Sequence, residues 1–163
     1  MRYASGPTVE VSVVIDAPLQ QVWALVSDIK LPARFSDEFL GAAWIDDSPG
    51  PGARFRGRNR HDALGEWETI CYVCRYEPPR AFAWDVNDPQ HPSASWWFEL
   101  DPHPGGVHVR YGARIGPAPS GLTIAITAMP DKEERIIARR LREFERNLTA
   151  TLQGIKTLAE ARG

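Results

Sequence analysis

Four polar residues in this sequence could together act on a carbonyl compound. A neutral His61 could accept a proton near neutral pH, because the unperturbed pKa of histidine is about 6.5. Tyr111 and Arg140 could donate hydrogen bonds to a developing enolate oxygen, and Asn59 could orient a carbonyl group. These residues are far apart in the sequence, so this chemistry depends on a fold that brings them together.

The motif Cys71-Tyr72-Val73-Cys74 has the Cys-x-x-Cys spacing of redox and metal-binding pairs. It lies in the middle of an expected strand, where residues three apart point to opposite faces and lie roughly 10 Å apart. A disulfide needs Cα atoms within about 7 Å of each other, so we expect two free thiols. The histidines fall on different elements without the spacing of metal ligands, so we expect no metal site.

Aromatic side chains are unusually frequent, with six Trp, six Phe and four Tyr, and strand alternation places many of them on one face of the expected strands. For each single residue an ordinary core position is the better interpretation. Together they favour a cavity for an apolar ligand, because one helix cannot fill a curled sheet. Phe35 and Phe39 are expected near its entrance. The predicted ligand-contacting residues are Phe35, Phe39, Phe55, Trp67, Thr69, Phe82, Trp84, Trp96, Phe98, Tyr111, Phe144, Asn147, Leu148 and Thr151.

Arg140 has two possible environments. It lies at the edge of the apolar stripe of the expected C-terminal helix, about 40° from Phe144. A charge at such an edge usually extends to water. The alternative is that its guanidinium meets a ligand carbonyl or carboxylate inside the protein.

Arginines occupy every second position from 54 to 60, and they bear on the strand register. They could form an anion-binding stripe, or a solvated outer face paired with the glutamates of the next strand. The turn at 62–65 allows Arg60 to lie opposite Glu66 or opposite Trp67. We adopt the first register, which gathers the charges outside, places Asn59 on the inner face, and leaves no clear carboxylate inside.

The elements that position these residues follow from periodicity and turn signals. Strands are expected at 8–15, 41–46, 53–61, 66–76, 80–86, 93–101 and 107–115, with helices at about 18–30, 32–37 and 131–160. Segment 122–129 is apolar and β-branched, and it fits either type of element. Strands joined by short turns must be antiparallel, and an amphipathic helix covers their apolar face. The predicted fold is α+β, with a seven-stranded antiparallel sheet curled around a long C-terminal helix and two short helices between the first two strands.

Length and charge narrow the class of protein. A chain of 163 residues is expected to form one domain, 1–163. With 19 basic and 21 acidic residues, bulk charge does not indicate a nucleic-acid partner. No apolar run approaches the roughly 18 residues of a membrane span, so no stable membrane insertion is expected. The N-terminus lacks the apolar segment of a signal peptide, so we expect a cytoplasmic protein, as a monomer or homodimer.

Two stretches resemble a known family. The opening pattern Val9-x-Val11…Ile15-x-Ala17-Pro18…Val22-Trp23 resembles the SRPBCC superfamily of START-like helix-grip proteins. The stretch Trp44…Gly50-Pro51-Gly52-Ala53-Arg54-Phe55…Trp67 is similar to its bacterial members labelled polyketide cyclase/dehydrase-like. The resemblance covers nearly the whole chain. It implies a helix-grip fold with a deep hydrophobic cavity between sheet and helix, apolar or aromatic ligands, and no metal or redox cofactor.

Three functions remain open. The first is binding or transport of an apolar small molecule, either aromatic and polyketide-like or lipid-like, driven by burial at roughly 25 cal/mol per Å². The second is an aromatase/cyclase-type enzyme that closes and dehydrates a poly-β-ketone, with Asn59, His61, Tyr111 and Arg140 as its catalytic groups. A protein–protein adaptor ranks last, because it would need a large exposed apolar patch.

Overall fold

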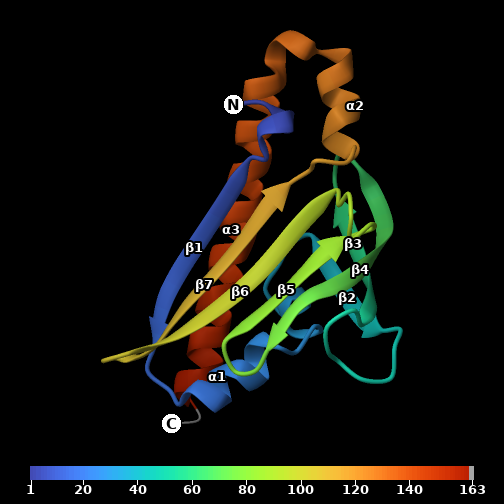
Figure 1. The fold of residues 1–163 in the computed structure, drawn as a ribbon. Coiled ribbons are helices and arrows are strands. Elements are labelled where there is room, and N and C mark those ends of the chain that lie inside the picture. Colours follow the sequence, from blue (N-terminus) through green and yellow to red (C-terminus); the bar gives the residue numbers. More distant parts are fainter. Residues whose placement is uncertain (162–163) are drawn as a thin grey trace.

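Seven strands form one antiparallel sheet in the computed structural model, which describes residues 1–161 (Figure 1). Their order across the sheet is β1-β7-β6-β5-β4-β3-β2, so the first and last strands of the chain are neighbours. This confirms the predicted sheet. The strands are β1 (Thr8–Ile15), β2 (Phe39–Trp44), β3 (Arg54–His61), β4 (Gly65–Glu77), β5 (Ala81–Val86), β6 (Ala94–His103) and β7 (Gly106–Ile115).

One long helix runs along the sheet. This helix, α3 (Glu133–Ala161), has 29 residues and is about 43 Å long. Figure 1 shows α3 behind the sheet, with α1 (Leu19–Val26) near one end and α2 (Gly121–Ala128) beside the other. The remaining helical segments are short 3₁₀ turns: η1 (Tyr3–Ser5), η2 (Leu31–Arg34) and η3 (Pro130–Lys132). No helix among residues 1–161 is long and apolar enough to cross a membrane.

Some predicted boundaries were wrong. The helix α1 ends at Val26 rather than near residue 30, and the second helical piece is the 3₁₀ turn η2. Segment 122–129, which fitted either type, is largely the helix α2. The preference of its β-branched residues for strands is outweighed by a cap at the N-terminus of the helix. There the Ser120 hydroxyl accepts a hydrogen bond from the Leu122 N–H, and the Thr123 hydroxyl accepts one from the Ser120 N–H.

The predicted register of the β3–β4 hairpin is confirmed. Arg60 lies opposite Glu66, and Asn59 lies opposite Trp67. The outer-face charges pair less regularly than expected, since Arg56 binds Glu68 of β4 but Arg54 binds Asp46 of the preceding loop. This register decides which side chains of β3 and β4 face α3.

The core is formed where the inner face of the sheet meets the apolar stripe of α3. Ile137, Leu148, Leu152 and Ile155 recur at helical spacing on α3 and are each no more than 2% exposed. The opposing strands contribute Phe82, Phe98, Leu100, Val107 and Val109, which are equally buried. Val22 and Trp23 of α1 join the cluster of Leu148, Leu152 and Ile155, whereas Ile137 belongs to a second, smaller cluster with Phe144. The space between the sheet and the middle of α3 is not filled by these residues, and it holds the site.

Candidate functional site

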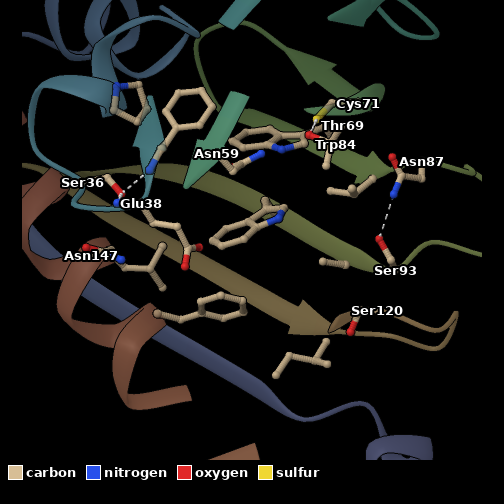
Figure 2. A pocket seen from close by; sticks show the side chains of 18 of the residues that line it. Ser36, Glu38, Asn59, Thr69, Cys71, Trp84, Asn87, Ser93, Ser120 and Asn147 are labelled. Carbon is tan, nitrogen blue, oxygen red and sulfur yellow. Dashed lines mark hydrogen bonds between the residues drawn. The ribbon is translucent and has the colours of Figure 1, made fainter. Parts of the chain in front are cut away.

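A cavity of about 450 Å³ lies between the inner face of the sheet and α3 (Figure 2). This volume falls in the range of small-molecule pockets. Every predicted site residue lines it except His61 and Phe35. Those that do are Phe39, Phe55, Asn59, Trp67, Thr69, Phe82, Trp84, Trp96, Phe98, Tyr111, Arg140, Phe144, Asn147, Leu148 and Thr151.

Aromatic rings cover the wall of the cavity because strand pairing aligns them in rows. Phe82, Phe98 and Tyr111 face one another across β5, β6 and β7, and the rings of Phe98 and Tyr111 stack with centroids 3.9 Å apart. Trp84 and Trp96 form a second row. Phe144 of α3 meets Trp96 at 4.9 Å between centroids, so strands and helix contribute to one aromatic lining.

The Tyr111 hydroxyl is a buried polar group on this lining. The residue is 6% exposed, and its hydroxyl has no hydrogen-bond partner within residues 1–161. Burial raises the pKa of Tyr111. The phenol therefore stays protonated at neutral pH and can donate a hydrogen bond into the cavity.

A polar clasp lies at one side of the cavity. It consists of Glu38 and Arg140, which line the cavity, and of Glu143 and His61, which do not. Arg140 binds both carboxylate oxygens of Glu38, at 2.6 and 2.9 Å, and Glu143 at 2.9 Å. The His61 ring Nε2 lies 3.1 Å from Glu143. The clasp therefore ties α3 to the segment before β2 and to the end of β3.

Arg140 thus does not take the first of its two expected environments, and its contact with a ligand stays a prediction. Its guanidinium does not extend to water, and protein carboxylates already bind it. Burial alone would lower the pKa of Arg140, but the hydrogen bonds and charges of Glu38 and Glu143 raise it. Its guanidinium also lies 4.5 Å from the centre of the Phe144 ring, so the charged group forms part of the cavity wall.

We expect the clasp to weaken in acid. Burial would raise the pKa of Glu143, but hydrogen bonds from Arg140 and then His61 lower it below the ordinary value of 4.5. A lowered pKa stabilises the folded state above pH 4.5, and that stabilisation is lost as the pH falls through the folded-state pKa. Urea unfolding between pH 3 and 6 should show less pH dependence for Glu143→Gln than for the wild type. Equal pH dependence in the two proteins would contradict the prediction.

The structure contradicts the predicted orientation of His61 toward the cavity. Alternation does place His61 on the inner side of β3, but at the end of the strand, beyond the cavity. Its Nδ1 accepts the Ala63 N–H, so Nε2 carries the proton that faces Glu143. No ring nitrogen is left to accept a proton from a ligand.

The position of Phe35 also differs from the prediction. Instead of lining the entrance, it packs on α3, where a Cβ at position 154 would overlap its ring. Gly154 therefore provides the space that lets η2 approach the helix. Phe39, the other residue expected at the entrance, does line the cavity.

Several parts of the cavity wall were not predicted from the sequence, among them Glu38 and the helix α2. Glu38 is a carboxylate on the lining, although none was expected there. It lies in the short connection before β2, where no periodicity indicates which side faces inward. The helix α2 contributes Leu122 and Ile124. The Ser-x-x-Thr pattern at Ser120 was the sequence signal that could have identified this helix.

The two cysteines face opposite ways, as their spacing in β4 predicted. Cys71 is buried on the cavity wall and Cys74 is exposed, and both are free thiols. Burial raises the pKa of Cys71 to about 12. Partial desolvation of the Cys74 sulfur, together with the nearby charge of Asp85, raises the pKa of Cys74 to about 11, so neither thiol is an activated nucleophile. Among residues 1–161 no three side chains of His, Cys, Asp or Glu come together as metal ligands. The absence of a metal stays a prediction.

Comparisons with known proteins agree with this geometry. Residues 6–160 match the model of a family described as polyketide cyclase/dehydrase and lipid transport. The solution structure of the polyketide cyclase-like protein Cgl2372 from Corynebacterium glutamicum is 30% identical, with a TM-score of 0.69 over 96% of this chain and 93% of that one. A search of the curated proteins found no match.

Two larger proteins share the fold at lower identity. They are the di-domain aromatase/cyclases BexL, from the BE-7585A biosynthetic pathway, and StfQ, from the steffimycin pathway. Their identities are 18% and 13%, and both TM-scores are 0.72. The matches cover 97% and 95% of this chain but 51% of each of those chains, so the chain spans about half their length.

Proposed function

The chain belongs to the polyketide cyclase/dehydrase and lipid transport family, and from this premise we propose that it binds an apolar, aromatic or lipid-like small molecule in the cavity between the sheet and α3. The observation that carries the proposal is the aromatic lining, in which Trp84, Trp96 and Phe144 surround open space inside a packed domain. A ligand that buries about 200 Å² of apolar surface there would gain about 5 kcal/mol. Shape and a few hydrogen bonds then suffice for binding.

The test is a titration followed by tryptophan fluorescence. Three of the six tryptophans line the cavity, so a bound ring should change the emission. The panel should contain flat aromatic compounds of two to four rings and fatty acids of increasing length. We expect saturable binding of at least one of these classes. Failure of the whole panel at its solubility limits would contradict the proposal.

A second candidate function is cyclisation of a poly-β-ketone. One observation favours it: Asn59, Tyr111 and Arg140 line the same cavity, and their side chains are of the types that can bind carbonyl or enolate oxygens. The candidate lacks an evident base, because Nδ1 of His61 accepts a backbone N–H and Glu38 is bound by Arg140. Two proteins of the same fold are named as aromatase/cyclases, which is a further reason to test cyclisation.

The titration can be extended to decide between the two candidates. A purified poly-β-ketone should be incubated with the wild-type protein, with Tyr111→Phe, and without protein. A cyclase would change the ratio of cyclised products, and the variant would change it less. Equal product ratios in all three samples would contradict the cyclase candidate and leave ligand binding as the proposed function.

A further inference from the structure

The hydrogen-bonding groups that face the cavity are not balanced between donors and acceptors. Three tryptophans on its wall, Trp67, Trp84 and Trp96, carry indole N–H groups, which can only donate. None of these N–H groups has a hydrogen-bond partner within residues 1–161. The Tyr111 hydroxyl and the Asn59 amide on the same wall also lack partners in that part of the chain.

These groups are not sealed inside the protein. The Nε atom of Arg110 is the one fully buried side-chain nitrogen or oxygen without a partner among residues 1–161. The five donor groups are therefore accessible to a ligand or to water, and their residues line the cavity. Placing a polar group in an apolar site is unfavourable unless a ligand or water forms a hydrogen bond with it.

The acceptors on the cavity wall are in a different state, because most of them already accept hydrogen bonds from the protein. Figure 2 shows Ser36, Glu38 and Asn147 on one side of the aromatic rings, and Asn87, Ser93 and Ser120 on the other. On the first side, Ser36 accepts from the Phe39 N–H, Glu38 from Arg140, and Asn147 from the Asp37 N–H. On the other side, Asn87 accepts from the Ile70 N–H, Ser93 from the Asn87 amide, and Ser120 from the Leu122 N–H.

We propose that the indole N–H groups of Trp67, Trp84 and Trp96, with the Tyr111 hydroxyl and the Asn59 amide, form a donor lining that selects ligands bearing carbonyl or other acceptor oxygens over hydrocarbon ligands of the same shape. The inference rests on the proposed function, since it concerns the ligand of the same cavity. Rings of the ligand pack on the aromatic wall, and its oxygens accept from the donors. A fatty acyl chain leaves these donors unsatisfied along its length.

The first test compares two probes of nearly equal shape, 9-fluorenone and fluorene, by tryptophan fluorescence. The two differ by one carbonyl oxygen. A cavity without specific donors would bind the more hydrophobic fluorene more tightly from water. We expect 9-fluorenone to bind about three- to tenfold more tightly instead, which is the effect of one satisfied hydrogen bond.

Variants locate the preference in named donors. Tyr111→Phe keeps the ring stacked on Phe98 and removes only the hydroxyl, so it should weaken binding of 9-fluorenone and leave that of fluorene unchanged. Asn59→Leu serves as a second variant if the first does not fold. The matched control is Tyr76→Phe, because Tyr76 does not line the cavity, although it packs against Trp23 and Phe82.

The indole protons give a direct readout of the hydrogen bonds. In a ¹H–¹⁵N spectrum, at least one resonance of Trp67, Trp84 or Trp96 should move downfield with 9-fluorenone and not with fluorene. The Trp97 indole, which already donates to Glu10 at 2.8 Å, should not move. Equal or tighter binding of fluorene, or no downfield shift, would overturn the donor lining while leaving the binding function intact. Failure of both probes and of the wider panel would overturn the binding function itself.

Discussion

Replacing Arg140 by leucine is expected to lower the free energy of unfolding by about 3–5 kcal/mol, the typical cost of removing one partner of a buried ion pair. The Arg140, Glu38 and Glu143 side chains are only 10%, 14% and 18% exposed. Without the guanidinium, two carboxylates remain close together with little water to solvate them. Urea unfolding at pH 7 measures the loss.

Two further variants make this result specific to the clasp. Arg139→Leu is the matched control, because Arg139 is the exposed neighbour on the same helix and forms no ion pair within residues 1–161. Its free energy of unfolding should change by less than about 0.5 kcal/mol. The double variant Glu38→Leu/Arg140→Leu should recover much of the loss, because it removes one of the two stranded charges. A loss below about 1 kcal/mol for Arg140→Leu would show that the clasp contributes little to stability.

Filling the cavity from the β6 side is expected to abolish ligand binding without unfolding the protein. Ala94 lies on the wall at the start of β6, and its side chain points to the same side of the sheet as those of Trp96 and Phe98. In Ala94→Trp the indole would occupy space that the ligand otherwise takes. A ligand that loses about 120 Å² of apolar burial loses about 3 kcal/mol, or more than about 100-fold in affinity.

Ser12→Trp is the control for this experiment, because it adds an indole to an exposed position on β1. It should bind the panel of aromatic and fatty-acid ligands as the wild type does. Thermal unfolding should show that Ala94→Trp is as stable as the wild type, or more stable, because the new side chain fills empty space. Unchanged affinity in a folded Ala94→Trp protein would place the ligand elsewhere.

Local sequence patterns determined most of the fold and the face on which most site residues lie. The two-residue alternation of β5 and β6 assigned Phe82, Trp84, Trp96 and Phe98 to one side of the sheet, because successive strand residues point to opposite faces. The charge pattern of β3 and β4 selected the register that puts Asn59 inside. The helical spacing of apolar residues predicted that α3 covers this face.

The tertiary structure alone decided which polar groups face the cavity freely and which are bound by the protein. Periodicity predicts on which face of a strand or helix a side chain lies. It does not predict where along the cavity the side chain lies, or which residue from a distant part of the chain binds it. His61 lies on the predicted face and is held by Glu143, 82 residues away. Arg140 is held by Glu38, 102 residues away, in a connection that has no periodic pattern. Long-range pairs of this kind form only when the sheet curls around α3, so no local pattern encodes them.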